Sequence, residues 1–268
     1  MPLPPRYLPR TLLLLDAIGL QFNNDLVVVI FAVLFAGFLR GFVGFGAALV
    51  VVPILSLVYG PIMAIPAAAV MGLPATALLL SDAIRFSEPR IVLPISVAIF
   101  ICTPIGVWTL VSVDPQLMKI VISLLVVIMV MMLFKGWKLT HDPGLLVLSA
   151  AGAAGGIIQG AAGIGGPPVV AVALSRAGPI AQQRANVVGV MTAISLSSFL
   201  PLWYFDLLSR ESIALGLVLF APNWIATWVG AHYFSSGGQS HYRIAALTVL
   251  ALIGVSTLAA ALRDFAQN

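Results

Sequence analysis

The chain has 268 residues, of which 61% are hydrophobic and only 8% are charged. Because an average soluble domain carries about 25% charged residues, this chain could not cover a water-exposed surface, and its long apolar runs place it in a lipid bilayer. The formal charge of +4 comes from scattered Lys and Arg residues with no run that could follow a phosphate backbone, which argues against nucleic acid as a partner.

Apolar stretches of spanning length predict an all-α polytopic membrane protein with about eight transmembrane segments. Residues 1–24 are interpreted as a retained, partly interfacial N-terminal extension, since Asp16 interrupts its apolar run and no small-residue cleavage site follows. The first half holds the segments Leu26–Tyr59, Pro61–Ile84, Ile91–Val111 and Pro115–Phe134. After the polar connection, the second half holds Gly144–Ser175, Ala181–Phe205, Glu211–Phe234 and His241–Leu262.

The first and fifth segments are too long to cross a membrane as single helices. Leu26–Tyr59 as one helix would reach roughly 50 Å, against a hydrocarbon core of about 30 Å. Both segments carry a glycine cluster near the middle, so we expect both to be broken, either crossing or re-entering. If they cross, the positive-inside rule puts both termini in the cytoplasm. If they re-enter, the Lys and Arg count decides little and the two halves are inverted in topology.

The two halves share a register of glycines. Arg40–Ala47 aligns with Gln159–Gly166, and three glycines coincide. Shared hydrophobicity is easily matched by chance, but coincident glycines at matched spacing are harder to obtain. We therefore predict two four-segment repeats, residues 25–134 and 144–263, joined by residues 135–143.

Arg40 lies deep within an apolar segment, where a charged side chain costs roughly 2.5 to 3.5 kcal/mol. It either offers a fixed positive charge to an anion in a water-filled cavity, or bonds carbonyl groups freed at the helix break. The glycines after it leave backbone N–H groups uncovered, and a new helix is predicted near Ala47. A helix N-terminus carries unpaired N–H donors and about half a positive charge, which suits an anion.

The second glycine cluster repeats this pattern and is followed by Pro167 and Pro168, which suit the first turn of a helix. Two half-helix N-termini that converge would form a site at the repeat interface; alternatively, the glycines only allow close helix packing. Gln159 occupies the Arg40 position, so the site would be asymmetric in charge and suited to a small anion. The candidate substrate-binding residues are Arg40, Gly41, Gly44, Phe45, Gly46, Gln159, Gly160, Gly163, Gly165, Gly166, Asn186 and Asn223.

No catalytic or nucleotide-binding motif accompanies these residues. No Walker lysine follows the glycine clusters, and His-Glu-x-x-His and Gly-x-Ser-x-Gly stretches are lacking. Cys102 is the single cysteine, so a disulfide framework and a cysteine metal site are excluded. We therefore predict a protein that is not an enzyme and uses no cofactor or metal.

Two stretches carry a family resemblance. Ala36–Ala47, with Pro53 downstream, resembles the first signature of the TauE/SafE sulfite exporter family, and Gly155–Pro167 resembles its second. The resemblance extends over the chain from about Asp25. It implies a secondary transporter for sulfite, a sulfonate such as sulfoacetate, or thiosulfate.

The expected setting is the inner membrane, with the anion and the lipid bilayer as partners and a homo-oligomer left open. Two other classes remain: an anion channel with the same site but no alternating access, and a non-transporting membrane scaffold.

Overall fold

The computed structural model describes residues 24–43, 46–134, 143–173, 180–234, 255–256 and 258–266. Its regular structure is helical, and no strand occurs among these residues, which agrees with the predicted all-α class. The helices of the first half are α2 (Asn24–Val43), α3 (Ala47–Tyr59), α4 (Pro61–Phe86), α5 (Pro89–Ser112) and α6 (Pro115–Phe134). Those of the second half are α7 (Leu145–Ala162), α8 (Gly166–Ala173), α9 (Ile180–Ser197), α10 (Phe199–Tyr204) and α11 (Arg210–Phe234).

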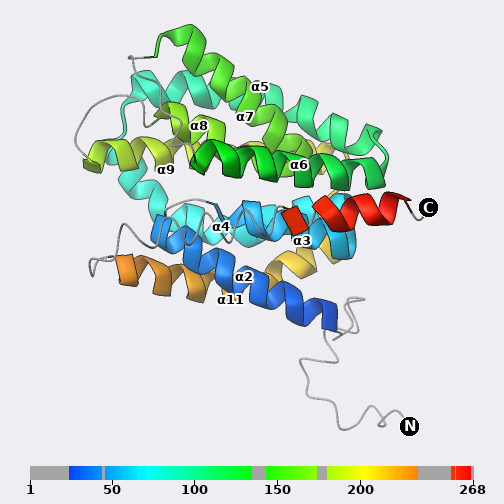
Figure 1. Cartoon of the computed structure of the whole chain (residues 1–268). Coiled ribbons are helices and arrows are strands. Elements are labelled where there is room, and N and C mark those ends of the chain that lie inside the picture. The colour runs from blue at the N-terminus through cyan, green and yellow to red at the C-terminus, as the bar shows by residue number, and fades with distance from the viewer. Residues whose placement is uncertain are drawn as a thin grey trace, which may run out of the picture.

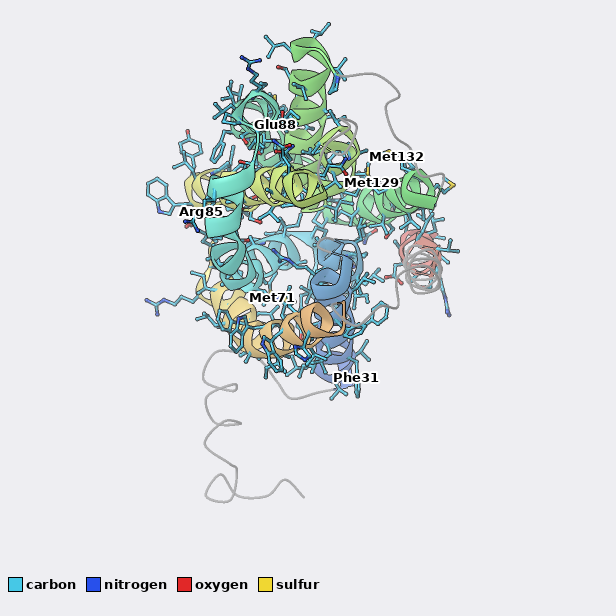
Figure 2. The ribbon with its side chains drawn as sticks, turned by 90° about the vertical axis from the view of Figure 1, so that its left-hand side faces the viewer. Phe31, Met71, Arg85, Glu88, Met129 and Met132 are labelled. Carbon is cyan, nitrogen blue, oxygen red and sulfur yellow. The ribbon has the colours of Figure 1, made fainter. Side chains whose placement is uncertain are left out.

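Five stretches within the described residues are long and apolar enough to cross a membrane. They are Pro89–Ser112, Pro115–Met132, Leu145–Ala162, Ala185–Tyr204 and Arg210–Gly230. Large apolar side chains cover the outside of these and other helices, with Phe31 69% exposed on the outer side of α2 (Figure 2). Such exposure suits lipid rather than water. The last predicted segment, His241–Leu262, falls mostly outside the described residues, so the eight-segment arrangement stays a prediction.

Prolines and a capping carboxylate set where several helices begin. Pro61, Pro89 and Pro115 are each the first residue of a helix, where the missing N–H costs nothing and the fixed φ favours helix. Asp114 caps α6, since its Oδ1 accepts the N–H of Gln116 at 2.8 Å. Arg85 and Glu88 lie at the corner between α4 and α5 (Figure 2). These signals agree with the sequence boundaries of the second, third and fourth segments.

Both glycine clusters interrupt a helix, as expected. Gly46, with φ of 99°, separates α2 from α3, and Gly163, with φ of 68°, ends α7 before α8 begins. These left-handed conformations are accessible to glycine without a Cβ clash. Glycine is therefore the residue that permits each break.

At the second break the chain turns back on itself. Val169 of α8 lies directly against Gly155 of α7, and Gly165 lies against the Gly155 carbonyl, so that a Cβ on either glycine would collide. α8 thus runs back along the C-terminal part of α7 instead of continuing its line. This geometry is that of a helical hairpin, and whether the segment re-enters the membrane stays a prediction. On the re-entrant reading the Lys and Arg count gives no orientation, so the cytoplasmic placement of both termini stays a prediction.

Helices from opposite halves pack in close pairs. α5 packs on α7 and α2 packs on α11, at opposite sides of the molecule (Figure 1). Gly152, Gly156 and Gly160 of α7 face α5 so closely that a Cβ on any of them would collide with its backbone. Small residues spaced in this way let helix backbones approach within a membrane. Each pair thus joins one helix of the first predicted repeat to one helix of the second. α4 and α9 pack together between the two pairs.

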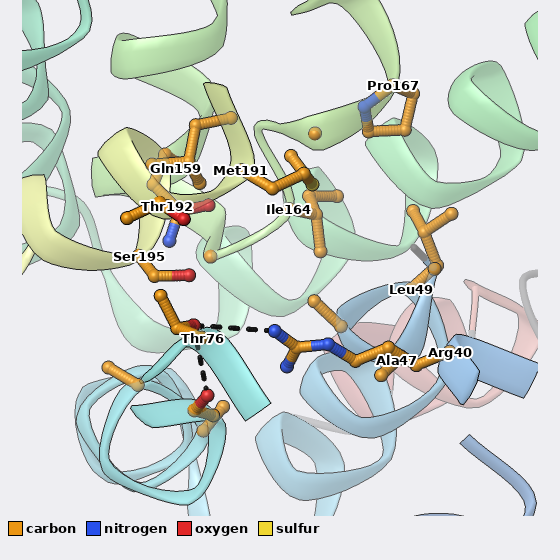
Figure 3. Close-up of a pocket in the computed structure, with 18 of the residues that line it drawn as sticks. Arg40, Ala47, Leu49, Thr76, Gln159, Ile164, Pro167, Met191, Thr192 and Ser195 are labelled. Atoms are coloured by element: carbon orange, nitrogen blue, oxygen red, sulfur yellow. Dashed lines mark hydrogen bonds between the residues drawn. The ribbon is translucent and has the colours of Figure 1, made fainter. Parts of the chain in front are cut away.

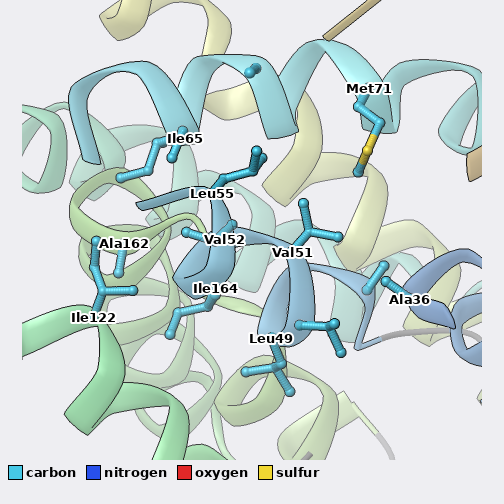
Figure 4. Close-up of a cluster of buried hydrophobic side chains, with 14 of the residues drawn as sticks. Ala36, Leu49, Val51, Val52, Leu55, Ile65, Met71, Ile122, Ala162 and Ile164 are labelled. Atoms are coloured by element: carbon cyan, nitrogen blue, oxygen red, sulfur yellow. The ribbon is translucent and has the colours of Figure 1, made fainter. Parts of the chain in front are cut away.

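The largest buried cluster surrounds α3. Leu49, Val52 and Leu55 of α3 pack with Ile65 of α4 and Ile122 of α6 (Figure 4). Because α3 is enclosed by α2, α4 and α6, its N-terminus opens inside the protein and not toward lipid. The unpaired N–H groups at that end must therefore find their partners in the interior.

Candidate functional site

A cavity of about 120 Å³ lies between α2, α3 and α4 on one side and α7, α8 and α9 on the other. Both helix breaks open onto it, because Gly46 and Gly163 line its wall. Arg40 is the one charged residue among its described lining residues, which include no carboxylate. The cavity therefore has a net positive lining.

Arg40 enters the cavity from the last turn of α2 (Figure 3). Its Nη2 donates a hydrogen bond of 3.4 Å to Thr76 Oγ1 of α4, and that hydroxyl donates to the Gly72 carbonyl at 3.2 Å. Gly72 lies beside the guanidinium, since a Cβ there would be in van der Waals contact with Arg40 Nη1, at 3.5 Å. A guanidinium has five N–H donors, so most of them remain available to a ligand in the cavity.

The N-terminus of α3 supplies backbone donors next to Arg40. Gly46, Ala47 and Ala48 line the cavity, and the Leu49 N–H is accepted by the Gly46 carbonyl at 3.1 Å. The N–H groups of Ala47 and Ala48, at the first two positions of the helix, have no partner within it. Together with the positive end of the helix dipole, they add to the charge of Arg40 on the same side of the cavity.

The N-terminus of α8 also reaches the cavity but offers fewer donors. Its second and third residues, Pro167 and Pro168, have no N–H. The N–H of Gly165 is accepted by Gln159 Oε1 at 3.1 Å, and Met191 lies over Gly166, where a Cβ would be 3.0 Å from its Cε. The two half-helix N-termini therefore face one cavity with unequal numbers of free amide groups.

Gln159, at the position equivalent to Arg40, is engaged within the protein. Its Oε1 binds the Gly165 N–H and its Nε2 donates to Ser198 Oγ, also at 3.1 Å. The side chain is 9% exposed and lines the cavity. Its amide thus holds the α7–α8 turn in place, and any ligand would meet only its remaining hydrogen-bonding capacity.

The other candidate glycines divide between the cavity and the helix interfaces. Gly163 and Gly166 line the cavity with Gly46. Gly160 packs on α5 and Gly165 packs on α7, while Gly41 lies in the last turn of α2, outside the lining. Gly44 and Phe45 lie outside the described residues.

The two candidate asparagines bind between helices. Asn186 Oδ1 accepts the backbone N–H of Glu88 at 2.6 Å, which ties α9 to the start of α5. Asn223 Nδ2 donates to the Met71 carbonyl at 3.5 Å, which ties α11 to α4. Neither residue is part of the cavity lining.

The lining also contains three hydroxyl residues that were not predicted from the sequence: Thr76 of α4 and Thr192 and Ser195 of α9. Isolated Ser and Thr residues in apolar helices commonly bond a carbonyl of their own helix. Thr192 does so, since its Oγ1 donates to the Val188 carbonyl at 2.9 Å. The sequence carried no signal that would separate a cavity hydroxyl from one of this ordinary kind.

Residues 29–257 match the family described as Sulfite exporter TauE/SafE. Searches of curated proteins and of solved structures give no significant match.

Proposed function

Since the chain belongs to the TauE/SafE sulfite exporter family, we propose that it is a secondary transporter that moves a small sulfur-containing oxyanion through the cavity by alternating access. Sulfite and organosulfonates such as sulfoacetate are the proposed substrates. The family is one of membrane transporters, and the apolar helices identify a multi-pass membrane protein.

The observation that carries the proposal is the unbalanced positive charge of the cavity. Arg40 and the N-terminus of α3 face the same space, and no carboxylate lines the described wall. A cation removed from water without an opposite charge is strongly disfavoured. An oxyanion would supply that charge and could accept hydrogen bonds from the guanidinium and from the amides of Ala47 and Ala48.

The volume of the cavity suits a small oxyanion. A cavity needs a volume on the order of 10 to 15 Å³ to hold one water molecule. The cavity volume of about 120 Å³ therefore holds an anion of a few oxygens together with some water. Most of the remaining lining is apolar, with Leu49, Ile65 and Ile164 among it. An apolar surrounding strengthens the electrostatic attraction at the polar end.

The position of the cavity suits alternating access. It lies between helices that belong to two closely packed pairs, α2 with α11 and α5 with α7. Movement of one pair relative to the other would open the cavity to one side of the membrane and then to the other. We place the protein in the inner membrane, and coupling to an ion gradient is part of the proposal.

Sulfite flux into liposomes tests the proposal with Arg40→Ala and a matched control, Arg85→Ala. Arg85 is exposed in the last turn of α4, away from the cavity. We expect saturable flux that responds to a proton gradient, is lost in Arg40→Ala and is retained in Arg85→Ala. Arg40→Ala flux at the wild-type rate and affinity would overturn the proposal.

Two further outcomes point to the other classes. Arg40-dependent flux that neither saturates nor responds to a gradient would indicate a channel. Failure of every small oxyanion to bind or stabilise the protein would indicate a scaffold.

A further inference from the structure

Ser195 presents an unused hydroxyl to the cavity. It belongs to α9 and is half-buried in the wall across from Arg40. Figure 3 shows the hydroxyl pointing into the cavity, toward the side from which the Arg40 guanidinium and Thr76 enter. It makes no hydrogen bond to a residue in the described part of the chain.

The neighbouring hydroxyls are all engaged. Thr192 donates to the Val188 carbonyl at 2.9 Å, and Ser197 donates to the Ile194 carbonyl at 3.0 Å. Ser198 accepts from Gln159, and Thr76 joins Arg40 to the Gly72 carbonyl. Helical serines commonly bond a carbonyl of their own helix, whereas the Ser195 hydroxyl makes no such bond in the described part of the chain and faces the cavity. Ser195 therefore has a free donor where a ligand would lie.

We propose that Ser195 donates a hydrogen bond to the transported oxyanion from the α9 wall, opposite Arg40. This inference rests on the proposed function and adds to it a residue of the second half that contacts the substrate. The oxygens of a sulfite or sulfonate group point in several directions, so one group can accept from Arg40 and from Ser195 together. The bound anion then bridges α2 and α4 to α9.

This bridging has a consequence for specificity. A chloride ion can also accept several hydrogen bonds, but all at one centre, so it spans a shorter gap between the two walls than the separate oxygens of a sulfite or sulfonate group do. Ser195 therefore favours multi-oxygen anions over chloride. Removal of its hydroxyl lowers the affinity for sulfite and leaves the affinity for chloride, measured by competition, nearly unchanged.

Calorimetric titration of the purified full-length chain with sulfite tests the proposal. Because a hydrogen bond to a charged group is lost, Ser195→Ala weakens sulfite binding about tenfold or more, whereas Ser195→Thr, which keeps the hydroxyl, restores most of it. The matched control is Ser197→Ala on the same helix, whose hydroxyl is bonded to the Ile194 carbonyl and lies outside the cavity lining; it changes the affinity about twofold or less. If Ser195→Ala does not purify as folded protein, Ser195→Cys replaces it with the same expected loss, because a thiol is a weak donor.

The outcomes separate this inference from the proposed function. Unchanged sulfite affinity in Ser195→Ala, with binding lost in Arg40→Ala, would overturn the role of Ser195 and leave the proposed function standing. Unchanged affinity in Arg40→Ala would overturn the proposed function itself.

Discussion

Two substitutions of Gln159 test two properties of the site separately. One tests the hydrogen bonds that hold the α7–α8 turn, and the other tests the attraction of the cavity for an anion. In Gln159→Leu, the buried Gly165 N–H loses its acceptor and Ser198 loses its donor. Each unsatisfied buried group costs about 1 to 3 kcal/mol, so the two together lower the free energy of unfolding by about 2 to 6 kcal/mol. We expect a clear fall in the thermal unfolding temperature of the ligand-free protein.

Gln159→Glu is expected to keep the stability of the protein and to weaken anion binding. The introduced carboxylate still accepts the Gly165 N–H, and Ser198 can donate to it, so folding is retained. The same carboxylate adds a negative charge to the cavity wall. At a separation of roughly 6 Å and an effective dielectric of about 20, it repels a bound anion by about 3 kcal/mol, or roughly a hundredfold in affinity.

Thermal unfolding and sulfite titration of both variants check this reasoning. The expected pair of results is a destabilised Gln159→Leu and a stable Gln159→Glu that has lost sulfite binding. Sulfite affinity at the wild-type level in a folded Gln159→Glu would refute the placement of the anion in this cavity. An unchanged unfolding temperature in Gln159→Leu would refute the capping of the α7–α8 turn.

Three other predictions concern the helix interface, Thr76 and the ligand. Gly160→Ala places a Cβ against the backbone of Thr103 and Val107 in α5 and should destabilise the protein by about 1 to 3 kcal/mol, measured by thermal unfolding; Gly144→Ala, with open space around it, is the control. Thr76→Val removes the hydrogen-bond acceptor of Arg40, so sulfite affinity should fall by a factor of about three to ten with little change in stability; wild-type affinity would show that Thr76 does not position Arg40. In a thermal-shift assay, sulfite and sulfoacetate should stabilise the protein more than taurine, because no carboxylate of the described lining meets the taurine ammonium; a preference for taurine would contradict the electrostatic account.

The breaks in the two long segments could be predicted from sequence for a physical reason. Each segment exceeded the bilayer thickness, and glycines such as Gly46 and Gly163 are the residues that tolerate the left-handed backbone needed there. The direction of the chain after Gly163 could not be predicted in the same way. Hydropathy is the same whether α8 continues the line of α7 or folds back, and only the packing of Val169 on Gly155 decides between them.

The roles of individual glycines and polar residues were harder to predict. Gly160 and Gly163 belong to one cluster, yet the first packs on α5 and the second lines the cavity. Helix spacing would have separated them only with knowledge of which face of α7 meets α5. Gln159 aligns with Arg40 in sequence, but its amide is used to hold Gly165 and Ser198, a use that depends on the reversal of the chain.

A crystal structure of the protein with selenite, a close chemical analogue of sulfite whose selenium scatters anomalously, tests the central claim most directly. The account predicts one strong anomalous peak in the cavity, with oxygens contacting the Arg40 guanidinium and the amides of Ala47 and Ala48. A cavity without such a peak, at selenite concentrations where the anion binds the protein in solution, would contradict it.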